Sequence, residues 1–421
     1  MRRTGLSIYV LLLGAPACFI PHPEPDEDDA DGPVAIDADL EPDSAPIDVD
    51  ADLEPDATPV DAGAFDAPPL SVDGMIAAAC PAGVCDPAKV VSYWRNEWDD
   101  HSVKRTVRFQ DVSATEHHLV VTDEAGNPAT LEFAAGVPVS LTLLNPGDPT
   151  SAGKHDLTAP ELFRAVAWRR VRSIHGEVRA TFVDAVHVRR RAGSDLSAVL
   201  EFVPINAGSF DVYCQIGVPN GNQYDAIAAG TVEPDLVNTS GHAGKGAKAT
   251  ATITAATTAL SVTYAASALG ADPRRVPTNG IWANGVRNDT YRADPIDMFE
   301  FSDEEYAFIP SNPSLSIGVG YVLRLSNSPE NLRAHVFSSS DFFEDSVVRE
   351  VQDDDVEVES STLKSFQVLV GDHMEVFAVP TLAGTYVWYC DVAVQLNPDG
   401  SPRLNTGHAA RGMVGSLTVV P

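Results

Sequence analysis

The stretch that decides the fold lies near the end of the chain. Residues 379–390 read VPTLAGTYVWYC, and residues 407–420 read GHAARGMVGSLTVV. Alternating apolar side chains before Cys390 and after Met413 predict two strands, which enclose the order Cys390, His408, Met413. A thiolate, an imidazole and a thioether are the donors that hold copper in one-electron sites. The stretch therefore predicts a metal site built on strands.

The same pattern occurs a second time, earlier in the chain. Three pairs of blocks align without gaps and in the same order: HDLTAPELF (155–163) with HVFSSSDFF (335–343), VPINAGSFDVYC (203–214) with VPTLAGTYVWYC (379–390), and GHAGKGA (241–247) with GHAARGM (407–413). The separation from the first His to the Cys is 59 residues in one copy and 55 in the other. This agreement predicts a duplicated domain.

Short strand-like segments surround these blocks in both copies. We expect strands at 137–144 and 319–325, at 199–203 and 375–379, at 210–216 and 386–394, and at 249–253 and 415–420. A short helix is expected after each His block, at 162–171 in the first copy. Many short strands punctuated by Gly and Pro predict an all-β fold with two sandwiches.

The segment from Tyr389 to Val419 resembles the ligand strand and ligand loop of the cupredoxin family, to which plastocyanin and azurin belong. The resemblance covers both copies, roughly residues 104–421. It implies tandem Greek-key β-sandwiches, type 1 (blue) copper and electron transfer. Its motif implies four copper ligands in the second copy: His335, Cys390, His408 and Met413.

The first copy departs from the family pattern at the axial position, where Ala247 replaces the methionine. The resemblance implies copper there through His155, Cys214 and His242, and the loss of the thioether favours Cu(I). A degenerate site kept for structure is the alternative.

Two further features lie outside the family pattern. The loops between the Cys and the second His are long, with 27 residues at 215–241 and 17 at 391–407. They are either partner-docking lids or tolerated loop expansions. The neighbouring His117 and His118 are expected to be a surface pair.

Residues 1–18 are typical of an export signal. Arg2 and Arg3 precede a short apolar run at 8–13, and the small residues before Cys18 resemble the lipobox of bacterial lipoproteins. An ordinary signal peptide cut nearby is the alternative. The apolar run is too short to span a bilayer. We therefore expect attachment only through a lipid on Cys18, in the periplasm or at the cell surface.

Residues 19–74 differ sharply in composition from the rest. They contain 18 Asp and Glu, ten Pro and no Lys or Arg, and they include the near-repeat DLEPDSAP (39–46) and DLEPDATP (52–59). Such a segment cannot bury a core and its like charges repel, which predicts a disordered tether. The formal net charge of −32 argues against nucleic acid as a partner.

A short lead-in at 75–103 connects the tether to the predicted domains at 104–254 and 255–421. It contains Cys80 and Cys85, which form a small disulfide in an oxidising compartment or, alternatively, a metal pair.

Nitrite reductases and multicopper oxidases also combine cupredoxin domains, but they use additional copper centres built mostly from His-x-His pairs and a His beside the Cys. No His-x-His occurs in this chain. Tyr213 and Gln215 flank Cys214, and Tyr389 and Asp391 flank Cys390. We therefore predict that the chain is not an enzyme.

These features together predict an exported copper protein that carries electrons one at a time between redox protein partners. Nothing in the sequence indicates an obligate oligomer. The alternative is copper scavenging, or a structural surface module, without electron transfer. The chain has five Met and no Met-rich tract, which weighs against scavenging.

Overall fold

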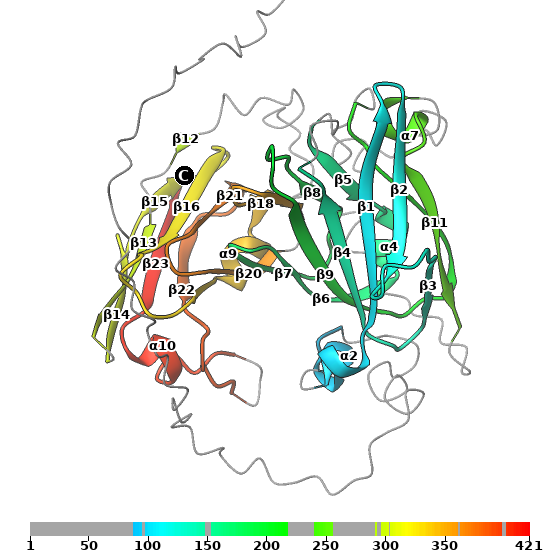
Figure 1. The fold of residues 1–421 in the computed structure, drawn as a ribbon. Helices are drawn as coiled ribbons and strands as arrows, with labels where there is room; N and C mark the ends of the chain where they lie inside the picture. The colour runs from blue at the N-terminus through cyan, green and yellow to red at the C-terminus, as the bar shows by residue number, and fades with distance from the viewer. Residues whose placement is uncertain are drawn as a thin grey trace, which may run out of the picture. The chain divides into compact units, whose positions relative to one another are not determined.

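A computed structural model describes residues 87–94, 97–147, 153–217, 240–255, 291–292, 296–302, 304–360, 363–397 and 401–421 (Figure 1). All of them belong to one compact unit. The predicted signal peptide and tether, with Cys18, Cys80 and Cys85, lie outside the described residues. Residues 256–290, at the start of the second predicted domain, also lie outside them, so the domain bounds stay a prediction.

The first half of the described chain follows two short helices, α2 (Pro87–Tyr93) and α3 (Trp98–His101). Its elements are β1 (Val103–Ser113), β2 (Glu116–Asp123), β3 (Leu131–Ala134), β4 (Val139–Asn145), β5 (His155–Thr158), α4 (Pro160–Arg164), β6 (Val166–Arg172), β7 (Gly176–Ala180), β8 (Ala185–Val188), β9 (Leu196–Pro204), β10 (Gly208–Tyr213), α7 (Gly241–Gly244) and β11 (Lys248–Thr254).

The second half repeats this series. Its elements are β12 (Tyr291–Arg292), β13 (Ile296–Ser302), β14 (Glu305–Ile309), β15 (Ser314–Ser316), β16 (Tyr321–Asn327), β17 (His335–Ser338), α9 (Ser340–Glu344), β18 (Ser346–Gln352), β19 (Val356–Glu359), β20 (Leu363–Val368), β21 (His373–Pro380), β22 (Gly384–Tyr389), α10 (Gly407–Ala410) and β23 (Val414–Val420).

These strands form two large sheets, and each sheet takes strands from both halves (Figure 1). The first runs in the order β2-β1-β4-β9-β6-β7 and continues into β20-β17-β22-β23-β15. The second runs in the order β14-β13-β16-β21-β18-β19 and continues into β8-β5-β10-β11-β3, with β12 paired to β16. Each half thus contributes one strand group to each sheet, in the same order. The prediction of an all-β fold is confirmed.

The two halves join through two antiparallel strand pairs. In one sheet β7 pairs with β20, with Glu177 opposite Gln367. In the other sheet β8 pairs with β19, with His187 opposite Glu357. We call these the β7–β20 seam and the β8–β19 seam.

The strands form where apolar residues alternate along the chain. In β4 the residues Val139, Leu141 and Leu143 are buried, and the residues between them are half-buried. Period-two alternation places one face of the strand in the core. Aromatic side chains such as Phe202 and Trp388 are buried in the core.

Three predicted elements are wrong in part. The strands expected at 210–216 and 386–394 end at Tyr213 and Tyr389. Helix α4 ends at Arg164, and β6 begins at Val166, so the expected helix at 162–171 is mostly strand. Val166 and Trp168 are β-branched or aromatic, and both are buried and pair with β9. Tertiary burial therefore decides the conformation of this segment. No helix in the part of the chain that the structure describes is long and apolar enough to cross a membrane.

Candidate metal centres

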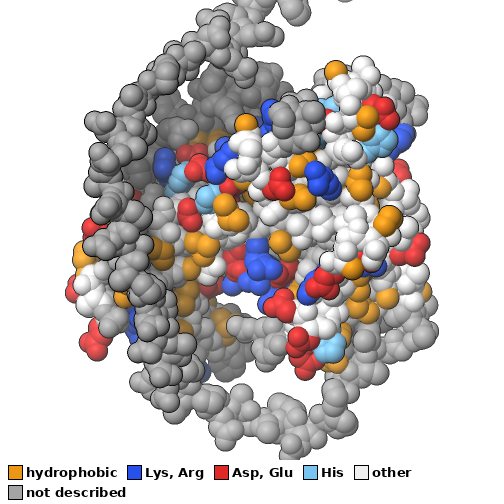
Figure 2. Space-filling model, in the orientation of Figure 1, with side chains coloured by type: hydrophobic (Ala, Val, Ile, Leu, Met, Phe, Trp, Pro, Cys, Tyr) orange, Lys and Arg blue, Asp and Glu red, His pale blue; other side chains and the backbone are white. Residues whose placement is uncertain are grey.

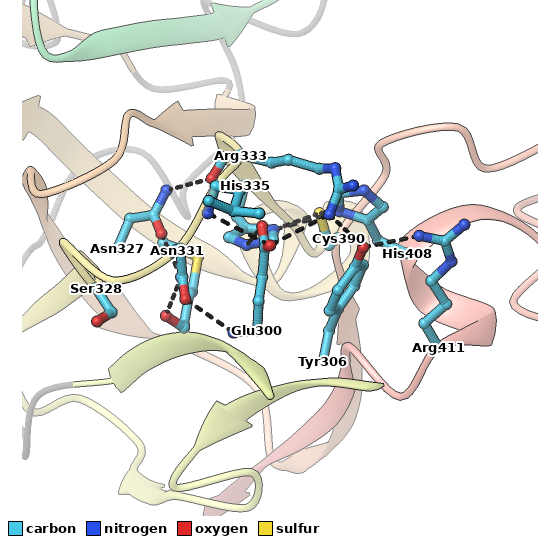
Figure 3. Close-up of polar contacts among 12 residues, drawn as sticks. Glu300, Tyr306, Asn327, Ser328, Asn331, Arg333, His335, Cys390, His408 and Arg411 are labelled. Atoms are coloured by element: carbon cyan, nitrogen blue, oxygen red, sulfur yellow. Dashed lines mark hydrogen bonds and ion pairs between the residues drawn. The ribbon is translucent and has the colours of Figure 1, made fainter. Parts of the chain in front are cut away.

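Three predicted ligands of the second half converge in the interior. His335 Nδ1 lies 3.8 Å from Cys390 Sγ, and His408 Nδ1 lies 3.4 Å from the same sulfur (Figure 3). The two Nδ1 atoms are 3.3 Å apart. All three residues are buried. The structure therefore brings together the thiol and both imidazoles that the sequence motif named.

Separate elements position these donors. His335 is the first residue of β17, Cys390 directly follows β22, and His408 lies in the short helix α10. Gly407 precedes His408 with φ of +59°, and a Cβ there would lie 2.4 Å from the carbonyl oxygen of Val392. Only glycine fits this backbone, which explains why a Gly precedes the His in the motif.

Met413 occupies the position that the motif assigns to the axial ligand. Its backbone N–H donates to the carbonyl of His408 at 3.2 Å, and its carbonyl accepts from the N–H of Cys390 at 3.0 Å. Its side chain is fully buried. These two backbone hydrogen bonds hold Met413 beside His408 of the ligand loop and Cys390 of the ligand strand.

Further residues contact the donors. The backbone N–H of Val336 donates to Cys390 Sγ at 3.3 Å. Glu300, on β13, lies with Oε1 3.1 Å from His335 Nε2. This is a charge contact and not a hydrogen bond, because neither Glu300 Oε1 nor His335 Nε2 has a hydrogen-bond partner. Glu300 was not identified from the sequence, because it lies 35 residues before His335 with no motif around it.

Tyr306, on β14, covers the second imidazole. Its ring lies 4.7 Å from the ring of His408 in an edge-on arrangement. The Tyr306 hydroxyl accepts hydrogen bonds from Arg333 at 2.9 Å and Arg411 at 2.7 Å (Figure 3). Two cations therefore lie near the site in the second half.

Burial sets the protonation of the donors. It lowers the pKa of His335 and of His408 to about 4, and it raises the pKa of Cys390 to about 12. At neutral pH without a metal ion, the imidazoles are neutral and the thiol keeps its proton. A cation between them stabilises the thiolate, so metal binding releases that proton.

The spacing of the three atoms fits a first-row metal ion. A triangle with sides of 3.3, 3.4 and 3.8 Å has its equidistant point about 2.0 Å from each corner. Metal–imidazole and metal–thiolate bonds are about 2.0 to 2.3 Å long. Two imidazoles and one thiolate are a donor set suited to copper.

The first half contains the same three donors. Cys214 Sγ lies 3.8 Å from His155 Nδ1 and 3.5 Å from His242 Nδ1, and the two Nδ1 atoms are 3.3 Å apart. The backbone N–H of Asp156 points at the sulfur from 3.5 Å. Burial lowers the pKa of His242 to about 4 and raises that of Cys214 well above its usual value.

The axial position of the first half holds Ala247, which is buried. Its N–H donates to the carbonyl of His242 at 2.9 Å, and its carbonyl accepts from the N–H of Cys214 at 3.0 Å. These bonds match those of Met413, so the backbone is preserved and only the thioether is replaced.

The surroundings of the first site also differ. Asp111, on β1, accepts a hydrogen bond from His155 Nε2 at 3.2 Å and contacts His117 Nδ1. The ring of His117 stacks on His242, with centroids 4.1 Å apart. His117 faces Asp111 across the β1–β2 pair as Tyr306 faces Glu300 across β13–β14. His117 therefore takes the place of Tyr306.

The prediction of a surface pair is wrong for His117, whose side chain is 2% exposed, while that of His118 is 45% exposed. The two side chains point to opposite faces of β2, because side chains alternate along a strand. The residues that follow, 119–121, are all apolar, so alternation in the sequence gives no signal that separates the two histidines.

The long ligand loops are described in part. Residues 218–239 of the first loop lie outside the described residues. In the second loop, Leu396 and Pro402 form an isolated antiparallel bridge, and the side chain of Leu396 is 63% exposed. This part of the loop is a surface excursion, as its composition predicts.

The comparisons with known proteins find similarity at the level of solved structures. No protein-family model and no curated protein matches the sequence. The chain is similar to a copper-containing nitrite reductase from Thermus scotoductus SA-01, with 12% identity, TM-score 0.23, and 76% of this chain and 61% of that chain covered. It is also similar to a copper nitrite reductase from Nitrosomonas europaea, with 11% identity, TM-score 0.22, and coverage of 76% and 94%.

A multicopper oxidase from Campylobacter jejuni is similar at 8% identity and TM-score 0.24, with coverage of 77% of this chain and 65% of that chain. TM-scores this low do not show that this chain shares the activity of those proteins. The chain's own strand order is that of an all-β fold with two large sheets, and the distant His of each half lies beside its Cys and second His. Each half also contains one Cys and two His as a donor set suited to copper.

The same comparisons correct the prediction that the chain is not an enzyme. The solved structures named above are copper nitrite reductases and a multicopper oxidase, which are enzymes. The prediction relied on the absence of sequence motifs, but motifs detect only ligands that are close in the chain. Strand pairing also joins residues far apart in sequence, and function depends on such sites rather than on the fold.

Proposed function

We propose that the chain is an exported protein with two tandem cupredoxin domains whose type 1 copper sites transfer one electron at a time. The observation that carries this proposal is the buried triangle of His335 Nδ1, His408 Nδ1 and Cys390 Sγ. Bound copper supplies a Cu(II)/Cu(I) couple there. The protein supplies a donor set whose geometry suits both states.

Rigid positioning supports electron transfer rather than loose metal storage. His335 is tied into paired strands, with Val368 opposite it in the register. Asn327 donates to the carbonyls of Val368 and Arg333, each at 3.0 Å, and so holds the residues around His335 in place. Donors that do not move on a change of copper charge keep the barrier to electron exchange low.

The two sites are proposed to differ in potential. In the second half Met413 serves as the axial ligand. In the first half His155, Cys214 and His242 hold copper without an axial thioether, because Ala247 offers no donor. Loss of the thioether favours Cu(I), so the first site has the higher potential.

The remaining parts of the proposal concern location and partners. Export and acylation at Cys18 would place the protein in the periplasm or at the cell surface. The acidic segment 19–74 would tether the copper domains, with a reach of about 3.1 Å per residue when extended. The partners would be redox proteins that approach the domains one at a time.

The test is to load the full-length protein with Cu(II) and to measure the visible spectrum, the copper content and the redox titration. We expect two coppers per chain, an intense thiolate-to-copper band, and reversible titration with two potentials. A chain that binds copper without that band has no type 1 site, which would contradict the proposal. Irreversible cycling would favour scavenging instead.

A further inference from the structure

A third cluster of possible metal ligands lies at the β8–β19 seam, apart from both copper sites. His187 on β8 and Glu357 and Glu359 on β19 present ligand atoms that all lie within 4.8 Å of one another. His187 Nε2 lies 2.8 Å from Glu359 Oε1 and 3.8 Å from Glu357 Oε1. We propose that this cluster binds a divalent transition-metal ion.

The burial of the cluster supports the proposal. The side chains of His187, Glu357 and Glu359 are 4%, 4% and 6% exposed. Asp156, on β5, is fully buried and places Oδ2 3.6 Å from His187 Nδ1. Three carboxylates thus face one imidazole inside the protein. Burying like charges together is costly unless a cation is placed among them.

Several polar atoms in this cluster have no hydrogen-bond partner. They are His187 Nδ1, Asp156 Oδ2 and Glu359 Oε2, each on a side chain more than nine-tenths buried. Nearly all buried polar atoms in proteins are satisfied. Of these atoms, Glu359 Oε2 belongs to the ligand set and would be satisfied by a metal ion. An ion on His187 Nε2 would keep the ring proton on Nδ1, which faces Asp156 Oδ2 at 3.6 Å.

Two protein cations partly balance these carboxylates. Lys154 pairs with Glu357 at 2.7 Å. Against the opposing effect of burial, the neighbouring acids raise the pKa of His187 to about 9, so a bound ion would replace the proton on its Nε2.

At the equivalent position of the β7–β20 seam, arginine side chains neutralise the buried carboxylate. There Gln367 faces Glu177, as His187 faces Glu357. Glu177 forms ion pairs with Arg170 and Arg179, and these guanidinium groups lower its pKa against the opposing effect of burial. Figure 2 shows basic and acidic side chains side by side over β6 and β7 near the middle of this face. Two arginines pair with the single carboxylate Glu177 at the β7–β20 seam, whereas one lysine and one imidazole face three carboxylates at the β8–β19 seam.

The donor set indicates the class of ion. One imidazole with carboxylate oxygens suits Mn²⁺, Fe²⁺ or Zn²⁺ rather than the softer Cu(I). The residues that would hold it come from both halves of the chain, 170 to 172 positions apart. The inference rests on these residues alone and holds whether or not the copper sites transfer electrons.

The experiment titrates Mn²⁺ into the full-length, copper-loaded protein and follows free Mn²⁺ by its paramagnetic resonance signal. Mn²⁺ is a weak competitor for thiolate sites, so the copper remains in place. We expect one tight ion per chain in the wild type. We expect His187→Gln and Glu359→Gln each to weaken it at least tenfold while the visible spectrum is unchanged.

Two controls make the result decisive. The carboxylates of the segment 19–74 are present in every variant, so the difference between wild type and His187→Gln isolates the seam. Glu177→Gln removes a buried carboxylate from the other seam and should leave the tight ion in place. Equal Mn²⁺ binding by wild type and both cluster variants would overturn the proposal. The proposal would also be overturned if Mn²⁺ stabilised wild type and Glu357→Gln equally against thermal unfolding.

Discussion

The two halves of the chain hold the same three donors in the same backbone but surround them differently. The second half adds a buried thioether from Met413 and a tyrosine, Tyr306, whose hydroxyl binds two arginines. The first half has Ala247 and His117 at those positions, next to Asp111. Distances among the three donors agree within 0.1 Å between the halves. Differences in copper chemistry between the halves must therefore come from the neighbours of the donors.

The largest effect is expected from removing either thiolate. Cys390→Ser should abolish the copper and the visible band of the second half, and Cys214→Ser those of the first, because a hydroxyl does not replace the thiolate. Metal analysis of each variant should give one copper per chain where the wild type gives two. If Cys214→Ser retains both coppers, the first half does not bind through this thiolate and the comparison fails.

The next effect concerns the carboxylates that lie beside the first imidazole of each site. Glu300→Gln should weaken copper binding in the second half by about 10- to 100-fold, as changes next to metal ligands typically do. Asp111→Asn should lower the copper affinity of the first half by a larger factor, because Asp111 contacts both His155 and His117. Competition with a copper chelator, read at the visible band, measures both affinities. Equal losses would show that His117 contributes nothing to the first site.

Exchanging the axial residues should shift the potentials in opposite directions. Met413→Ala should raise the potential of the second half, and Ala247→Met should lower that of the first. A tenfold change in the ratio of Cu(I) to Cu(II) affinity corresponds to about 59 mV. Met413→Ala should also destabilise the protein by about 2–5 kcal/mol, because it removes a buried side chain. Redox titration and thermal unfolding separate the two effects.

The smallest effect is expected from an ion at the β8–β19 seam. Asp156 lies beside that cluster, and its backbone N–H points at Cys214 Sγ. A cation there should raise the potential of the first half slightly and leave that of the second unchanged, because positive charge favours Cu(I). Titration with and without Mn²⁺, with His187→Gln as the control, would show this. A shift of both potentials would point to a general salt effect instead.

Much of the framework followed from local sequence. Cys390, His408 and Met413 are separated by one loop, and period-two alternation marks the strands on either side. The repeated blocks then indicated His155, Cys214 and His242 as a second set. The structure brings both sets together because β5 pairs with β10 and β17 pairs with β22, which places each distant His beside its Cys.

The sequence by itself determined which donors belong to each copper-suited site and that the fold is built from strands. Only the tertiary structure decided that Glu300 and Asp111 lie beside the first imidazole of each site, that His117 is buried, and that His187 meets Glu357 and Glu359. The physical reason is register. Alternation along one strand is local, but the partner across a sheet depends on how distant strands pack on a shared core.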